Sequence, residues 1–233
     1  MQFSRSIGVF RRHKWFSSAS IPKLNLVMDI DECMIHSVFE EDAGYRQDDD
    51  RTLSREGTAD GGRSVEVRQL KCEDGAPVKV NVRPGLAEFL QQTSKHFNVY
   101  AFTAALPVYA RPVLQSLDPE GSIFQDAWFR SDCTLVDVNG HKLYTKDVLG
   151  TAKLPAERTV LVDNNIFSFI PIPNNGIQVV NFTDQVDDDQ LYQLLPLLEH
   201  LDTEADVRRN LKSMFQLEAR LQPVLDVIQE RGQ

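Results

Sequence analysis

The chain has 233 residues, 42% of them hydrophobic, which is enough for one sizeable α/β domain with additional segments. Its formal net charge of −9 leaves no basic surplus to neutralise phosphates, which argues against nucleic acid as a partner. No stretch reaches the roughly 18 apolar residues of a transmembrane helix, so we expect no membrane-spanning segment. Three cysteines without a C-x-x-C pair predict neither a disulfide framework nor a zinc site.

Residues 1–20, MQFSRSIGVFRRHKWFSSAS, differ from the rest of the chain because they are rich in arginine and serine and contain no acidic residue. Phe3, Ile7 and Phe10 would lie roughly on one face of a helix, with the cations elsewhere. This composition is typical of a mitochondrial transit peptide and predicts a location in the mitochondrion. A disordered basic tail has the same composition, and the protein would then reside in the nucleus or the cytoplasm.

The segment after this leader begins with an apolar run at residues 25–30, NLVMDI, which predicts a buried strand. Residues 40–64 are polar and offer hardly any apolar anchor, so we expect a surface loop. Residues 65–71 and 78–82 flank an Asp-Gly turn and predict a β-hairpin. Apolar residues then recur at helical spacing over residues 83–97, which predicts a helix.

Buried strands and helices alternate through the second half of the chain. Residues 98–103 predict a second buried strand, and residues 106–117 predict a helix with a proline in its first turn. Over residues 127–146 the hydrophobic period falls to two, which predicts three short strands, the last two joined by an Asn-Gly turn. Residues 158–164 and 177–182 predict a third and a fourth buried strand.

The chain closes with helical periodicity over residues 187–201 and with one amphipathic helix predicted over residues 203–231. Buried strands that alternate with helices favour an α/β fold of the Rossmann-like kind, a parallel sheet with helices on both faces. The short strands of residues 127–146 then form a small antiparallel insert. We expect the main domain to extend over residues 24–213.

Polar side chains stand where three of the predicted strands end. Asp29 and Asp31 end the first strand, Thr103 ends the second, and Asp163 and Asn164 end the third. Ligands of parallel α/β sheets bind at the carboxyl ends of the strands, so we expect these residues to converge. Carboxylates with further oxygen ligands suit a hard cation such as Mg²⁺, which would also offset the repulsion between the two aspartates.

A metal alone would not require a hydroxyl and an ammonium group beside it, yet Thr103 and Lys146 offer both. Together with Mg²⁺ they would form a site for a phosphoryl group, whose oxygens carry the developing negative charge. One carboxylate could attack phosphorus and form an aspartyl-phosphate. The second could protonate the leaving oxygen and later activate a water molecule.

Seven ordered segments, from about Leu24 to Leu211, carry a resemblance to a known family: DIDECMIHS, VRPGLAEFL, YAFTAAL, WFRSDC, YTKDVL, VLVDNN and DDDQLYQLLPLLEHL. They resemble the small carboxy-terminal-domain phosphatases (NLI-interacting-factor-like), which belong to the haloacid dehalogenase superfamily. The resemblance implies a Mg²⁺-dependent phosphatase that acts on phosphoserine or phosphothreonine in protein substrates. The same superfamily branch includes a phosphatase-like receptor for mitochondrial presequences, so a binding module in protein import is the alternative function.

The resemblance also implies roles for single residues. Asp29 would be the nucleophile and a metal ligand, and Asp31 would be the general acid and base, with its backbone carbonyl on Mg²⁺. Thr103 would hydrogen-bond the phosphoryl oxygens. Lys146 would neutralise charge between Asp29 and the phosphate.

The remaining implied roles concern the metal and the substrate. Asp163 and Asn164 would complete the metal site, and Arg130 would lie near the substrate. The family pattern usually reads D-x-D-E-T, whereas here Cys33 replaces the threonine. A thiol is a weaker hydrogen-bond donor than a hydroxyl, so we expect a less firmly held turn and reduced activity.

Overall fold

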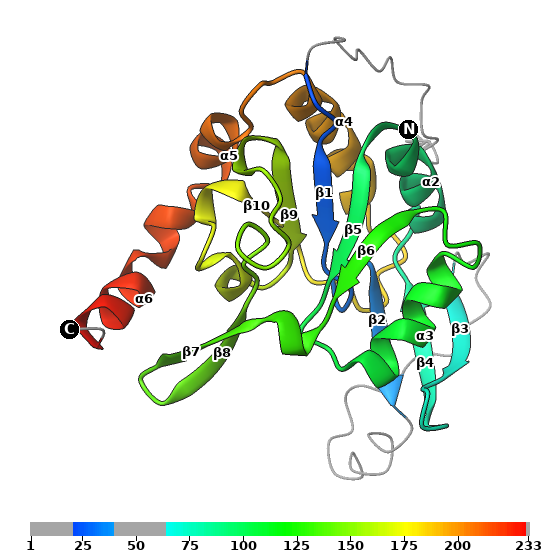
Figure 1. The fold of residues 1–233 in the computed structure, drawn as a ribbon. Coiled ribbons are helices and arrows are strands. Elements are labelled where there is room, and N and C mark those ends of the chain that lie inside the picture. Colours follow the sequence, from blue (N-terminus) through cyan, green and yellow to red (C-terminus); the bar gives the residue numbers. More distant parts are fainter. Residues whose placement is uncertain (1–20, 40–63, 232–233) are drawn as a thin grey trace, which may run out of the picture.

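The computed structural model describes residues 21–39 and 64–231, so the predicted leader (1–20) and nearly all of the predicted loop (40–64) lie outside the described residues. A five-stranded parallel sheet forms the centre of the molecule, in the strand order β10-β9-β1-β5-β6 (Figure 1). The strands are β1 (Asn25–Met28), β5 (Asn98–Phe102), β6 (Phe124–Trp128), β9 (Thr159–Asp163) and β10 (Gly176–Gln178). The predicted parallel α/β architecture is therefore confirmed.

The central strand β1 shows why an unbroken apolar run forms this sheet. Its four residues are all buried, because a parallel strand covered on both faces has no solvent-facing side; the one polar residue, Asn25, donates its amide to the carbonyl of Arg158. Leu26 and Met28 belong to one hydrophobic cluster and Val27 to a second one, as expected when successive side chains point to opposite faces. β1 pairs with β5 on one side and with β9 on the other.

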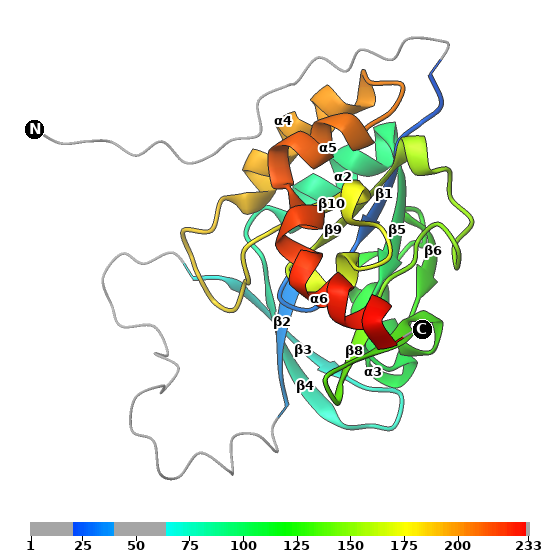
Figure 2. The ribbon, with the colours of Figure 1, turned by 90° about the vertical axis from the view of Figure 1, so that its left-hand side faces the viewer.

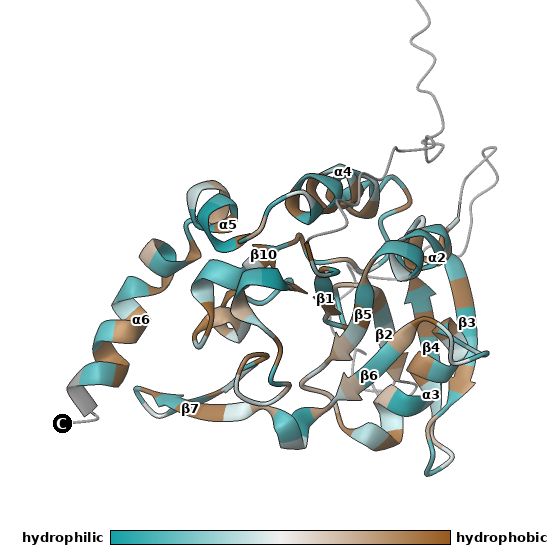
Figure 3. Cartoon of the chain, turned by 45° about the horizontal axis from the view of Figure 1, so that its top comes forward, coloured by the Kyte–Doolittle hydropathy of each residue, from teal (hydrophilic) through white to brown (hydrophobic). Residues whose placement is uncertain are grey.

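Helices cover both faces of the sheet (Figure 2). They are α2 (Leu86–His96), α3 (Pro107–Leu117), α4 (Gln190–Asp202), α5 (Arg208–Phe215) and α6 (Leu217–Arg231). α2 and α4 supply buried side chains to the cluster around Leu26, and α6 supplies Leu217 and Leu221 to the cluster around Val27. α2 and α4 are banded with hydrophobic and hydrophilic residues, as a helix with one buried face should be (Figure 3). Within residues 21–39 and 64–231, no helix is long and apolar enough to cross a bilayer.

A second, antiparallel sheet has the order β2-β4-β3 and was predicted only in part. The hairpin of β3 (Glu66–Lys71) and β4 (Pro77–Val82) is confirmed. The third strand, β2 (Ile35–Phe39), was not predicted. It is only five residues long, and of these only the first is buried, so its apolar pattern is too weak to predict a strand.

The predicted antiparallel insert at residues 127–146 is smaller than expected. β7 (Thr134–Val138) and β8 (His141–Thr145) form the hairpin, with Asn139 and Gly140 at positive φ as a two-residue turn requires. The first of the three expected strands, however, belongs to β6 and extends the main sheet as its edge strand. The prediction that it joins the insert was wrong, because a partly exposed edge strand mixes apolar and polar residues much as a strand of a small insert does.

The prediction of one helix over residues 203–231 was also wrong. The chain breaks between α5 and α6 at Gln216, which has left-handed backbone angles (φ 50°). Leu211 lies in the first hydrophobic cluster, whereas Leu217 and Leu221 lie in the second. The break lets consecutive apolar residues reach clusters on two different faces of the sheet. A glutamine at this position carries no sequence indication of a helix end.

Candidate active site

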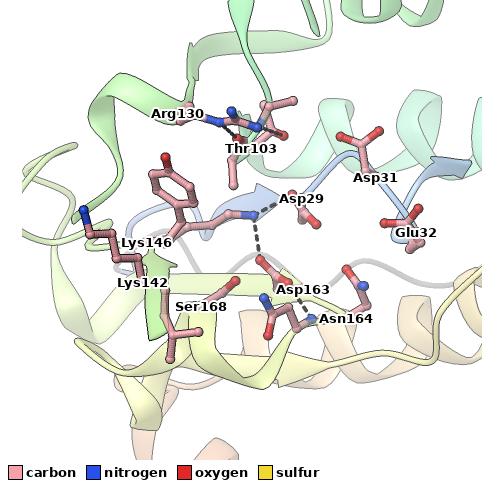
Figure 4. Close-up of a pocket in the computed structure, with 15 residues that line it drawn as sticks. Asp29, Asp31, Glu32, Thr103, Arg130, Lys142, Lys146, Asp163, Asn164 and Ser168 are labelled. Carbon is pink, nitrogen blue, oxygen red and sulfur yellow. Dashed lines mark hydrogen bonds and ion pairs between the residues drawn. The ribbon is translucent and has the colours of Figure 1, made fainter. Parts of the chain in front are cut away.

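One pocket at the carboxyl ends of β1, β5 and β9 contains every side chain to which the sequence analysis gave a catalytic, substrate-binding or metal-binding role (Figure 4): Asp29, Asp31, Thr103, Arg130, Lys146, Asp163 and Asn164. Asp29 follows β1 directly and Asp163 ends β9, and these strands are hydrogen-bonded neighbours. Lys146 follows β8 and therefore reaches the pocket from the antiparallel hairpin. The structure thus brings the predicted residues together, while their chemical roles stay predictions.

The ammonium group of Lys146 lies between two carboxylates at the base of this pocket. Its Nζ atom donates to Asp29 Oδ1 at 2.5 Å and to Asp163 Oδ2 at 2.6 Å. All three side chains are almost fully buried. The backbone of Asp29 is held as well, because its N–H donates to the carbonyl of Val162 at 2.9 Å. One positive charge therefore faces two negative charges in a place that excludes most water.

This imbalance between one positive and two negative charges shifts the pKa values of Lys146 and Asp29. Burial lowers the pKa of Lys146, but the charges of Asp163 and Asp29 outweigh it, and the net direction is upward. Burial raises the pKa of Asp29, and the charge of Asp163 raises it further, to about 8, although Lys146 opposes both effects. Lys146 is thus charged at neutral pH, and ionised Asp29 lacks a full counter-charge. A second cation would supply it.

The oxygens that could hold such a cation lie beside Asp29. A terminal atom of the Asn164 amide lies 3.1 Å from Asp29 Oδ2 and 3.2 Å from the Asp31 carbonyl oxygen. The amide can donate its NH₂ group to both oxygens, or it can turn its own oxygen inward and form a cradle of three oxygen ligands. In the described part of the chain, no three His, Cys, Asp or Glu side chains gather as a metal cluster. A set of carboxylate, carbonyl and amide oxygens fits Mg²⁺, which uses one or two carboxylates and keeps several waters.

Asp163 was predicted as a metal ligand, but its two oxygens are already hydrogen-bonded. Oδ2 accepts from Lys146 Nζ, and Oδ1 accepts from the backbone N–H of Asn165 at 2.7 Å. These hydrogen bonds make Asp163 a partner of Lys146, and its role as a metal ligand stays a prediction. Its charge fixes the ammonium group in position.

Asp31 has a partner that the sequence analysis missed. The hydroxyl of Tyr109, in α3, donates a hydrogen bond to Asp31 Oδ1, and the Tyr109 hydroxyl oxygen lies 2.5 Å from Ser37 Oγ. Burial raises the pKa of Asp31, while the hydrogen bond from Tyr109 lowers it. Tyr109 falls on the apolar face of its helix with Ala110 and Val113, so its spacing indicates only a core residue.

Thr103 and Arg130 approach the pocket from the side of β5. Thr103 is buried, and its Oγ1 accepts from the N–H of Ala105 at 2.9 Å, so its hydroxyl proton points away from that N–H; a hydrogen bond from Thr103 is one of the influences that lower the pKa of Asp31. Arg130 donates to the carbonyl of Ala104 at 2.6 Å, and its guanidinium group lies over the ring of Tyr144. Arg130 is exposed, so it presents positive charge at the rim of the pocket.

The turn that carries Asp31 is held by a buried arginine that the sequence analysis also missed. Arg83 donates to the carbonyls of Cys33 (2.8 Å) and Val180 (2.9 Å) and forms a two-point ion pair with Asp188. Cys33 itself is fully buried, with its Sγ 3.8 Å from the carbonyl of Val162.

A parallel α/β sheet with buried carboxylates, a lysine and a threonine hydroxyl at its carboxyl edge is typical of α/β proteins whose ligand site lies at the ends of the strands, and its chemistry suits an anionic ligand. A comparison with protein-family models then identifies the family. Residues 24–208 match the model described as NLI interacting factor-like phosphatase. The match covers most of the chain, and the chain belongs to this family.

Individual relatives agree with this assignment. The human carboxy-terminal domain RNA polymerase II polypeptide A small phosphatase 1 is 32% identical over 187 residues, which are 79% of this chain and 62% of the relative. The probable C-terminal domain small phosphatase of Dictyostelium discoideum is 33% identical over 184 residues, 78% of this chain and 52% of the relative. The chain thus spans between about half and two thirds of the length of these two relatives.

A search of solved structures finds the fission yeast RNA polymerase II CTD phosphatase Fcp1 bound to beryllium fluoride. The TM-score is 0.49 and the sequence identity is 20%, over 86% of this chain and 56% of that chain.

Proposed function

We propose that the protein is a Mg²⁺-dependent phosphatase that hydrolyses phosphoserine and phosphothreonine in proteins through an aspartyl-phosphate on Asp29. The observation that carries the proposal is the buried Lys146, shared by Asp29 and Asp163, next to the half-buried Asp31 in an open pocket. Such a cluster is costly to bury, and it serves a purpose where a phosphoryl group binds. Family membership supports the same chemistry.

Asp29 Oδ2, the carbonyl oxygen of Asp31 and the side-chain amide of Asn164 would hold Mg²⁺. When bound, the cation would supply positive charge for the phosphoryl oxygens and relieve the repulsion between Asp29 and Asp163. Lys146 already provides one positive charge at the base of the site. Thr103 can donate its hydroxyl proton to a phosphoryl oxygen, because its oxygen is fixed by the N–H of Ala105.

The reaction would proceed in two steps on the residues of this chain. In the first, the Asp29 carboxylate attacks phosphorus, the bond from phosphorus to the serine or threonine oxygen breaks, and Asp31 gives its proton to that oxygen. In the second, the Asp31 carboxylate takes a proton from water, whose oxygen attacks the phosphorus of the aspartyl-phosphate. Asp29 is released as a carboxylate together with inorganic phosphate. The raised pKa of Asp31 suits a group that must carry a proton in the first step.

A protein substrate is favoured by the shape of the entrance. In the described part of the chain, the narrow β7–β8 hairpin lines the pocket with Lys142 and Tyr144. Arg130 lies at the same pocket (Figure 4), and a phosphorylated side chain on a polypeptide would meet these residues as it enters. The positive rim would attract an anionic substrate to an otherwise acidic protein. The alternative, a presequence receptor, gains no support from the buried charges, which peptide binding would not require.

The decisive test is hydrolysis of 4-nitrophenyl phosphate and of phosphopeptides by the purified protein, with Mg²⁺ and with EDTA. We expect turnover with Mg²⁺, loss of turnover with EDTA, and preference for phosphoserine or phosphothreonine over phosphotyrosine. Wild-type protein that hydrolyses none of these substrates with Mg²⁺ would overturn the proposed activity. Turnover that persists in EDTA would overturn the metal requirement alone.

We further propose that residues 1–20 direct the protein to the mitochondrion, because their composition is basic and lacks acidic residues. Deleting these residues should leave phosphatase activity unchanged and move a tagged protein out of mitochondria. A full-length tagged protein found only in the nucleus or the cytoplasm would contradict the proposal.

A further inference from the structure

The hydroxyl group of Tyr109 meets the carboxylate of Asp31 at the side of the active site. Tyr109 lies in α3, Asp31 in the turn after β1, and Ser37 in β2, so three separate elements converge here. Tyr109 donates to Asp31 Oδ1, and Ser37 Oγ lies 2.5 Å from the tyrosine oxygen. Only 8% of the surface of Tyr109 is exposed. Little water is therefore available to replace either hydrogen bond.

The direction of these hydrogen bonds follows from counting protons. A tyrosine hydroxyl has one proton, and Tyr109 gives it to Asp31 Oδ1. Ser37 must then be the donor to the tyrosine oxygen. The resulting chain runs from Ser37 through Tyr109 to Asp31. Because Oδ1 already accepts a hydrogen bond, the proton of a protonated Asp31 is favoured on the other oxygen, Oδ2.

Tyr109 is held firmly enough to impose this geometry. Its ring contacts the ring of Phe39 with a centroid separation of 5.4 Å, and its backbone N–H donates to the carbonyl of Leu106 at 3.1 Å. It also belongs to the main hydrophobic cluster. Ser37 is fixed from the other side, because β2 pairs with β4 in the register Ser37 to Val80. A donor held in this way adds little entropy cost when the reaction begins.

We propose that Tyr109 is a positioning residue that orients Asp31 for proton transfer to the leaving oxygen, with Ser37 orienting Tyr109 in turn. This inference rests on the proposed function, in which Asp31 is the general acid. Nothing in the mechanism requires Tyr109 to touch the substrate. Its effect should therefore depend on how much the leaving oxygen needs a proton.

The test compares two substrates for wild type and Tyr109→Phe. A phosphoserine peptide has a poor leaving group that needs protonation, whereas 2,4-dinitrophenyl phosphate has a good one that does not. We measure kcat/KM, because it covers only the steps up to loss of the leaving group. Tyr109→Phe should lower kcat/KM roughly tenfold for the phosphopeptide and less than about twofold for the dinitrophenyl ester. Ser37→Ala should show the same pattern with a smaller loss.

A double-mutant cycle separates this proposal from the proposed function. Asp31→Asn should lower kcat/KM for the phosphopeptide far more than for the dinitrophenyl ester, and adding Tyr109→Phe to it should cost nothing further. Tyr100→Phe is the matched control, because it removes a tyrosine hydroxyl from β5 outside the pocket. It should leave both substrates unaffected. Thermal unfolding of each variant checks that the fold is retained.

The possible outcomes are distinct. A selective loss for the phosphopeptide in Tyr109→Phe that vanishes in the Asp31→Asn background supports the proposal. An equal loss for both substrates, no loss, or a full additional loss in the Asp31→Asn background overturns it, while the phosphatase function stands. Asp31→Asn without any leaving-group dependence would overturn the general-acid role and the positioning role together.

Discussion

Two buried ion clusters flank the Asp31 turn, and they differ in charge balance. Arg83 meets one carboxylate, Asp188, at two points (2.8 and 2.7 Å), and its remaining hydrogen bonds go to backbone carbonyls. Lys146 meets two carboxylates, Asp29 and Asp163, at 2.5 and 2.6 Å. The first cluster is neutral and its groups are satisfied. The second carries an excess negative charge whenever Asp29 is ionised, and it lines a pocket.

This difference in charge balance indicates which of the two clusters takes part in the reaction. A neutral buried pair such as Arg83 and Asp188, whose guanidinium donates four hydrogen bonds within the protein, holds structure and has no excess charge to offer a ligand. An unbalanced cluster at a pocket lowers the free energy of unfolding of the protein. A cation that binds to the cluster raises this free energy again. Burial alone would not separate the two clusters, since both are almost fully buried.

The largest expected effect is on turnover. Asp29→Asn removes the nucleophile and the excess charge while it preserves side-chain volume. We expect kcat to fall by at least about a thousandfold, because an amide cannot form the acyl-phosphate. The melting temperature in EDTA should stay the same or rise. Asp126→Asn, an exposed acid on β6, serves as the control. Activity of Asp29→Asn within tenfold of wild type would rule out Asp29 as the nucleophile.

A substitution in the neutral cluster should instead lower the free energy of unfolding. Arg83→Met leaves the Asp188 carboxylate and two carbonyls buried without their donor, and should cost about 3–5 kcal/mol of unfolding free energy. The measurement is urea denaturation. Arg111→Met is the matched control, because the ion pair of Arg111 with Glu73 is exposed and 3.7 Å long, and should cost at most about 1 kcal/mol. Equal losses in the two variants would show that the buried pair has no special role.

The unbalanced cluster also predicts a pH dependence. Burial, followed by the charge of Asp163, raises the pKa of Asp29, so the folded state favours its protonated form. When the pKa of a group is higher in the folded state than in the unfolded state, the stability that the group contributes is complete below the pKa of the unfolded state, here near 3.8. That stability is lost as pH rises through the pKa of the folded state. In EDTA, wild type should therefore lose stability relative to Asp29→Asn between about pH 4 and pH 8. Melting temperatures of both proteins across this range provide the test, and parallel curves would contradict it.

The smallest effect is expected at Cys33, which links the two clusters. Its carbonyl accepts from Arg83, and its Sγ lies near the Val162 carbonyl that also accepts from the N–H of Asp29. A threonine hydroxyl is a better donor to that carbonyl. Cys33→Thr should raise kcat several-fold with little change in KM for an aryl phosphate. An unchanged or lower kcat would show that Cys33 is only a packing residue.

Some features of this protein follow from the sequence alone. Continuous apolar runs predicted β1, β5 and β9, because only strands buried on both faces carry such runs. Once three parallel strands are recognised, the residues at their carboxyl ends must meet at one edge of the sheet. This is why Asp29, Thr103 and Asp163 could be placed in one site. The Asn139-Gly140 turn could also be predicted from neighbouring residues alone, since its two positive φ angles favour that residue pair.

Other features were decided only by the tertiary structure. Gln216 takes left-handed angles because the helices on either side bury their leucines in different clusters, and no local pattern encodes that choice. Tyr109 and Arg83 have sequence contexts typical of a core residue and a surface residue. Their roles arise from partners 78 and 105 positions away in the chain, Asp31 and Asp188. A contact between distant residues depends on how the elements pack, and a single sequence contains no direct record of it.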